Sequence, residues 1–195
     1  MKKSKLLLFI AILAIAFILF PLPPANLYIR ITFDEIAGED CLLYYATDTA
    51  GGYTAEQYIA SKVDPYTGQV AFCLDSSLEK HLIGLRVDFP DTEDLICIKT
   101  ITISSAGIIQ QEFNPCNFFA EGNIALTNNA DITLVKPRNR AYISTGSVDP
   151  YIVLSDSLTS QIVECYSHYT LTRILICSLA LLGYFYTQRN IFNTK

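Results

Sequence analysis

"LRVDFPDTEDLICIKTITI", residues 85–103, contains two short apolar runs that each alternate with polar residues. Successive side chains of a β-strand point to opposite faces, so the first run places Arg86 and Asp88 on one face. The other face of that run is apolar and carries Leu85, Val87 and Phe89. The stretch therefore predicts two neighbouring strands joined by a turn, a pattern typical of antiparallel β proteins.

The second run departs once from strict alternation, because three positions separate Ile98 from Ile101. An extra residue in one strand of a pair produces such a step, and we expect a β-bulge near Lys99 and Thr100. The turn before this run carries three acids, Asp91, Glu93 and Asp94. Such acids could hold a hard cation such as Ca²⁺, but they lack EF-hand spacing, and we interpret the turn as solvated and metal-free.

Short runs rich in Val, Ile, Tyr, Phe and Thr, separated by Gly, Pro, Asn and Asp, fill the region from residue 26 to residue 165. This alternation of strands and turns predicts an all-β fold, a jelly-roll-like β-sandwich. We interpret residues 113–122 as a loop. The expected strands are 27–33, 41–46, 57–63, 69–74, 82–88, 96–104, 124–126, 132–135, 141–144 and 151–154.

The chain begins with an uncharged apolar run, Leu6–Phe20, which follows three lysines and precedes a proline-rich segment. A basic stretch before an apolar run also describes a secretory signal peptide, but prolines crowd the positions before the candidate cleavage site. With Ala25 included, the segment reaches the roughly 20 residues that a membrane-spanning helix needs. We interpret residues 1–25 as an N-terminal membrane anchor, with a cleaved signal segment as the alternative.

A second apolar segment, Tyr169–Tyr186, lies near the other end of the chain. Its centre would be apolar on all sides of a helix, and tyrosines stand at both ends, as is typical where a spanning helix meets the lipid head groups. Arg173 lies close enough to one end for its charge to reach those head groups. We predict a C-terminal transmembrane helix over residues 169–188, followed by a cytoplasmic tail, residues 189–195.

The basic residues outside the two predicted spans indicate the orientation of the chain. Three lysines precede the first span, and Arg189 and Lys195 follow the second. The positive-inside rule then predicts a two-span plasma-membrane protein with both termini in the cytoplasm and an extracytoplasmic central domain, residues 26–165. That central region contains eight of the 14 bases and all 19 acids, a formal charge of −11. A domain this acidic is not expected to bind nucleic acid.

One local cluster of bases interrupts this acidic region, and it consists of Lys136, Arg138 and Arg140. We interpret it as a solvated strand edge. The chain also contains six cysteines, none with the CxxC spacing of a zinc site. Four of them belong to the central domain, where buried free thiols and one or two disulfides both remain open. These four are Cys41, Cys73, Cys97 and Cys116.

No GxSxG, P-loop, GxGxxG or HExxH motif occurs, so the common catalytic and cofactor-binding signatures are missing from the sequence. We therefore expect no enzymatic activity and no cofactor. Tyrosines gather between positions 44 and 66, and their rings could form a platform that stacks against sugars. Packing within strands is the competing interpretation, because Tyr is a favoured strand residue. The candidate ligand-binding residues are Tyr44, Tyr45, Tyr53 and Tyr58.

Two segments of the chain are similar to a known kind of module. "LIGLRVDFPDTEDLICIKTITI", residues 82–103, resembles a strand, loop and strand pattern in β-sandwich modules of bacterial multi-span membrane proteins of cell-surface glycan synthesis, including large glycosyltransferase-like proteins. "STGSVDPYIVL", residues 144–154, resembles the strand on which such modules often end. The matching positions are Leu85, Arg86, Val87, Asp88, Asp149, Pro150 and Tyr151, whereas Phe89 stands where the modules place proline directly.

The resemblance covers residues 68–154 and implies a β-sandwich without catalytic residues of its own. Arg86, Asp88, Asp149, Pro150 and Tyr151 would then have a structural role. We expect a membrane-anchored accessory or glycan-recognising module of bacterial cell-surface polysaccharide machinery. Its partners would be the lipid bilayer and a surface glycan or a membrane glycosyltransferase. The alternative is a structural or protein-binding envelope protein that does not contact sugar.

Overall fold

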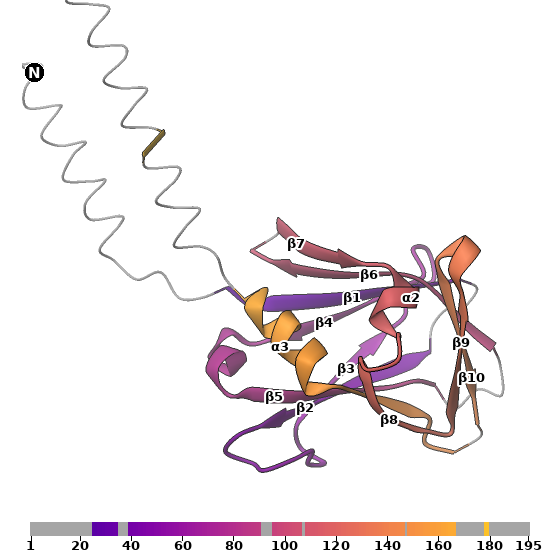
Figure 1. Ribbon diagram of the computed structural model, residues 1–195. Coiled ribbons are helices and arrows are strands. Elements are labelled where there is room, and N and C mark those ends of the chain that lie inside the picture. Colours follow the sequence, from indigo (N-terminus) through magenta and orange to yellow (C-terminus); the bar gives the residue numbers. More distant parts are fainter. Residues whose placement is uncertain are drawn as a thin grey trace, which may run out of the picture. The chain divides into compact units, whose positions relative to one another are not determined.

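Two antiparallel sheets pack face to face in the region from Ala25 to Tyr166 (Figure 1). The computed structural model describes residues 25–34, 39–90, 95–106, 108–146, 148–166 and 178–179. The acidic turn at 91–94 lies outside these ranges. So do the two segments predicted to cross a membrane, apart from residues 25 and 178–179, and the predicted cytoplasmic tail, residues 189–195. Within the ranges described, no helix has the length and apolarity needed to cross a membrane.

The first sheet has six strands in the spatial order β4-β1-β6-β10-β9, with β7 paired to β6. Its strands are β1 (Leu27–Asp34), β4 (Gln69–Leu74), β6 (Leu95–Ser105), β7 (Ile108–Phe113), β9 (Ala130–Val135) and β10 (Arg140–Thr145). The second sheet has five strands in the order β3-β2-β5-β11-β8. Its strands are β2 (Asp40–Thr47), β3 (Tyr58–Lys62), β5 (Leu82–Asp88), β8 (Ile124–Asn128) and β11 (Tyr151–Leu154).

This architecture confirms the predicted all-β sandwich, and each of the ten predicted strands overlaps a strand of the structure. The prediction did not include β7. Hairpins that stay within one sheet join β2 to β3, β6 to β7 and β9 to β10, and the other connections between strands cross from one sheet to the other. The expectation that the two strands of residues 85–103 are neighbours is therefore wrong, because β5 and β6 belong to different sheets.

The core lies between the two sheets and is built by alternation along each strand. In β1 every second residue is buried, and the residues between are half-exposed. The first sheet contributes the buried side chains of Ile31, Phe72, Ile98, Ile101 and Ile103. The second sheet contributes Leu43, Leu85, Val87, Phe89 and Ile152. The predicted inward face of residues 85–89 is thus confirmed.

The predicted β-bulge is also confirmed, and it changes one edge of β6. Thr32 of β1 lies opposite Thr100, but the next residue, Phe33, lies opposite Ile98, so Lys99 is the extra residue. On the other edge of β6, β10 pairs with residues 95–98 and β7 pairs with residues 101–105. Two strands therefore share that edge, with a gap between them at the bulge.

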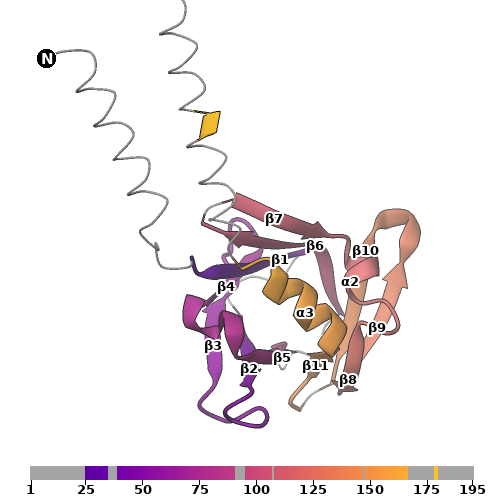
Figure 2. The same cartoon turned by 60° about the vertical axis from the view of Figure 1, so that its left-hand side comes forward.

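A nine-residue helix, α3 (Asp156–Glu164), lies between the two sheets (Figure 2). The Ser155 side chain accepts a hydrogen bond from the backbone N–H of Leu158, so the helix begins with an N-cap. Its inner face buries Leu158 and Ile162 in the same core. Just after the helix, the buried Tyr166 hydroxyl donates to the carbonyl of Asp75 at 3.0 Å, and burial raises the pKa of this tyrosine.

Three shorter helical segments complete the domain: η1 (Ser76–Lys80), α2 (Pro115–Phe118) and η2 (Lys136–Arg138). The segment α2 corrects the prediction of a loop over residues 113–122. Asn114 caps it by accepting a hydrogen bond from the backbone N–H of Cys116, and Pro115 occupies its first turn. Because four residues make only one turn, no helical periodicity could be seen in the sequence.

The five described cysteines are free thiols, which answers the open question for these positions. Cys73 is exposed, and the others are Cys41, Cys97, Cys116 and Cys165, all buried. Burial raises the pKa of the Cys41 thiol to about 12, and the charges of Asp40 and Glu39 act in the same direction. Since the thiolate is the reactive species, Cys41 is expected to be inert at neutral pH.

Candidate functional site

The outer face of the five-stranded sheet carries most of the residues that the sequence marked for function. Arg86 lies near its middle, on β5. Strand pairing places Tyr44 of β2 opposite Arg86 on one side, and Val153 of β11 opposite Arg86 on the other. Tyr58 of β3 in turn lies opposite Tyr44. Residues opposite each other in paired strands share a face, so these side chains form one surface.

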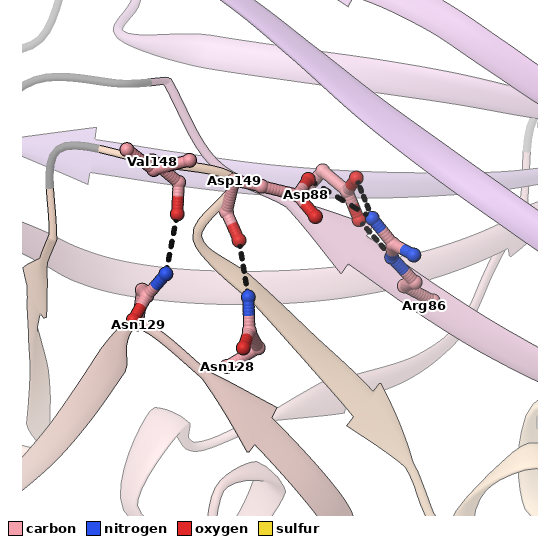
Figure 3. A network of polar contacts seen from close by, with 6 residues as sticks. All are labelled: Arg86, Asp88, Asn128, Asn129, Val148 and Asp149. Atoms are coloured by element: carbon pink, nitrogen blue, oxygen red, sulfur yellow. Dashed lines mark hydrogen bonds and ion pairs between the residues drawn. The ribbon is translucent and has the colours of Figure 1, made fainter.

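Arg86 and Asp88 form a two-pronged ion pair along β5, as Figure 3 shows. The guanidinium donates from Nε to Oδ1 at 2.6 Å and from Nη2 to Oδ2 at 2.5 Å. The two side chains are only 20% and 9% exposed. Their positions two residues apart on one strand face made this contact predictable, and the bidentate geometry fixes the guanidinium in space.

Asp149 supplies a second carboxylate to Arg86, from a loop 63 positions along the chain. The Nη2 atom of Arg86 lies 3.2 Å from its Oδ1, and this acid is 59% exposed. Burial of Arg86 by itself would lower its pKa, but hydrogen bonding and charge from Asp88, followed by the charge of Asp149, raise it. Arg86 is therefore held as a cation between two acids.

Two tyrosine rings cover the guanidinium of Arg86. Its Cζ atom lies 3.6 Å from the ring centroid of Tyr151 and 4.9 Å from that of Tyr44. Both distances are within the range of cation–π attraction. The structure thus brings Arg86, Asp88, Asp149 and Tyr151 together, although they come from two separate segments of the sequence. Pro150 joins them through its carbonyl, which accepts from the backbone N–H of Phe89 at 2.9 Å.

The turn between β8 and β9 holds the loop that carries Asp149. The Asn128 amide donates to the carbonyl of Asp149 at 2.8 Å, and the Asn129 amide donates to that of Val148 at 2.6 Å (Figure 3). Asp149 has a left-handed backbone, with φ of 48°, which an aspartate tolerates better than most residues. The sequence showed Asn128 and Asn129 only as a turn signal. It gave no sign of their role as a clamp, because this depends on the sheet register.

The four candidate tyrosines separate into two groups. Tyr44 and Tyr58 lie on the outer face with their ring centroids 5.4 Å apart and their planes tilted by 36°. Tyr53 lies over the same face, because a Cβ atom at Gly84 would stand 2.7 Å from its hydroxyl. Tyr45 instead packs against the core, which supports the strand-packing interpretation for that residue.

Tyr53 and Tyr58 both keep part of their surface exposed, and for Tyr53 the exposed fraction is 36%. Burial raises the pKa of Tyr53 to about 12, against a lowering influence from the Arg86 charge, because its hydroxyl is packed over Gly84. Tyr58 is 46% exposed, and Leu126, opposite Val153 on β8, is 54% exposed. The face therefore combines a fixed charged centre with open apolar surface on both sides.

Comparison of the chain with protein-family models, with curated proteins and with solved structures finds no match. The resemblance to β-sandwich modules of glycan-synthesis membrane proteins is untested by these comparisons and stays a prediction.

Proposed function

We propose that this chain is a membrane-anchored, non-catalytic module that recognises a glycan through the outer face of its five-stranded sheet. The observation that carries the proposal is the grouping of Tyr44, Tyr58 and Tyr151 around one fixed Arg86–Asp88 ion pair on that face. In its finer topology we take the sandwich to be jelly-roll-like. The module would serve bacterial cell-surface polysaccharide machinery, with a membrane glycosyltransferase as a natural partner.

The chemistry of sugars supports this role for the face. A pyranose ring has an apolar side that stacks on aromatic rings and a rim of hydroxyls that needs donors and acceptors. Tyr58 offers an exposed ring, and Tyr44 extends it. Asp149 keeps carboxylate surface open beside Arg86. Because both sheet pairing and ion pairs hold these groups, little conformational entropy is lost on binding.

Glycan binding is tested best with Tyr58, which is exposed and therefore dispensable for folding. In the Tyr58→Ala variant of the full chain, we expect affinity for a glycan selected on an array to fall by about tenfold or more, the loss typical of a central aromatic contact. Isothermal titration measures the change. The matched control is Tyr66→Ala, since Tyr66 is 95% exposed in the turn between β3 and β4 and is expected to leave affinity unchanged. Absence of binding to every array glycan would contradict the proposal.

A protein partner is the second candidate occupant, and the exposure of Leu126 favours it. An exposed leucine beside an exposed tyrosine is typical of interface centres, and a sugar gains little from the leucine. Leu126→Ala then distinguishes the two occupants. A sugar-binding face keeps its glycan affinity in this variant. A protein-binding face loses recovery of its partner in pull-downs from solubilised membranes.

Membrane location is part of the same proposal, with both termini in the cytoplasm and the sandwich outside. Cys73 is an exposed thiol of the sandwich, whereas Cys41 is kept inert by burial. In intact cells, we expect a membrane-impermeant maleimide to label wild-type protein at Cys73. Cys73→Ser should abolish this labelling, and a cysteine added at Ser4 of that variant should remain unlabelled until the cells are lysed. Labelling at Ser4 in intact cells would overturn the topology.

A further inference from the structure

A polar cleft lies on the six-stranded sheet, at the gap that the bulge leaves along β6. Its volume is about 490 Å³. Lys99 and Thr100 form its base, at the point where β10 has ended and β7 has not begun. Glu112 and Asn114 line one side, and Arg138 and Arg140 line the other. The cleft thus follows directly from the extra residue in β6.

The walls of the cleft are anchored to the core. The Cys116 thiol of α2 donates to the carbonyl of Arg140 at 3.3 Å, which joins the two sides. Asn139, between the two arginines, has a left-handed backbone with φ of 50° and ends η2. The side chain of Lys99 is held by Asp34, at 2.6 Å from Nζ to Oδ1. The cationic groups are therefore attached to a framework with fixed positions.

Charge distinguishes this cleft from the rest of the domain. The central domain has a formal charge of −11 and contains eight bases. Three of these bases line the cleft, namely Lys99, Arg138 and Arg140, whereas Glu112 is the one acid in its described lining. Across the described ranges, Arg138 and Arg140 make no ion pair with an acid. Arg140 donates from Nη1 to the carbonyls of Lys99 and Asn139 at 3.4 and 3.5 Å, which are long for hydrogen bonds. Its guanidinium thus keeps donors for a ligand.

We propose that this cleft binds an oxyanion, the carboxylate or phosphate group of a small ligand or of an acidic saccharide. Two arginines on one turn present planar donor sets, which suit the paired oxygens of these groups. Lys99 adds a positive charge at the base, partly offset by Asp34. The proposal concerns the opposite sheet from the glycan-recognising face, and it does not depend on that face binding sugar.

Titration of the full chain with inorganic phosphate, with glucuronate and with neutral glucose tests the site. We expect phosphate, glucuronate or both to bind, with glucose inactive, because the recognised feature is the anion. If only phosphate binds, the cleft recognises a phosphate group. If only glucuronate binds, the cleft recognises the carboxylate of an acidic sugar. In the double variant Arg138→Gln/Arg140→Gln, the affinity for the anion should fall by about tenfold or more.

Two controls separate the cleft from general charge effects. Lys62→Gln removes one exposed base from the other sheet, and it should leave anion affinity unchanged. Arg138→Lys/Arg140→Lys keeps the charge and should bind with intermediate affinity, which also covers the case in which the glutamine variant folds poorly. Failure of both anions to bind wild-type protein would overturn the proposal, and so would equal weakening by Lys62→Gln. Tyr58→Ala should leave anion binding intact, whatever its effect on glycan.

Discussion

Replacing Phe118 by alanine is expected to lower the free energy of unfolding by about 3–5 kcal/mol, the usual cost of deleting a buried phenylalanine ring. Phe118 is only 2% exposed. Its ring makes edge-to-face contacts with Phe113 and Phe119, with centroid distances of 5.2 and 5.0 Å. The four residues of α2 would then lose the side chain that attaches them to the sandwich.

Urea unfolding followed by circular dichroism measures this change. Tyr66→Ala is the matched control, because it removes an aromatic ring that is 95% exposed and should alter stability by less than about 0.5 kcal/mol. A loss below about 1 kcal/mol in Phe118→Ala would show that α2 does not depend on this ring. The anion cleft provides a second readout, since α2 holds the carbonyl of Arg140 through Cys116.

Arg86→Ala is expected to cost about 3 kcal/mol, at the lower end of the range for breaking a buried ion pair, because Arg86 keeps some exposure. The variant removes the cation from between Asp88, which is 9% exposed, and Asp149. It also removes the group that lies between the rings of Tyr44 and Tyr151. Arg86→Lys keeps the charge but loses the two-pronged geometry, so a smaller loss is expected.

A double-mutant cycle with Asp88→Asn isolates the pair, because the double variant should lose less than the sum of the single variants. The control pair is Lys62 and Asp40, which are 72% and 62% exposed, and Lys62→Ala should cost less than about 1 kcal/mol. Additive effects of Arg86→Ala and Asp88→Asn would show that the ion pair contributes little to stability.

Strand positions followed from the sequence where burial alternates strictly. The alternating residues of β1 are an example, and so is the slip between Ile98 and Ile101 that located the bulge. β7 escaped prediction because its two isoleucines, Ile108 and Ile109, are adjacent and both exposed, so they leave no period of two. For α3, the cap at Ser155 and the i, i+4 spacing of Leu158 and Ile162 are present in the sequence. These helix signals are short, and the strand signals of the surrounding region mask them.

The candidate site was predictable only in its local part. Residues two apart on one strand share a face, so the contact between Arg86 and Asp88 follows from the strand pattern alone. The meeting of Arg86 with Asp149 and Tyr151 depends on the pairing of β5 with β11, and no local pattern encodes that register. The tyrosines illustrate the same limit, since Tyr44 and Tyr45 are adjacent in sequence but point to opposite sides of the sheet.

The placement of β11 beside β5 has a consequence for the order in which the chain folds. During synthesis, residues 82–88 leave the ribosome long before residues 151–154. The edge of β5 that pairs with β11 therefore stays unpaired until β11 has been made. Strands this far apart in the sequence lose loop-closure entropy before their contacts form. Domains rich in such pairings fold in about milliseconds to seconds. Until β11 pairs, the free edge of β5 and the charge of Arg86 are accessible to other protein chains, which favours aggregation. The arrival of β11 closes the sheet edge and brings Tyr151 and Asp149 to Arg86 in the same step.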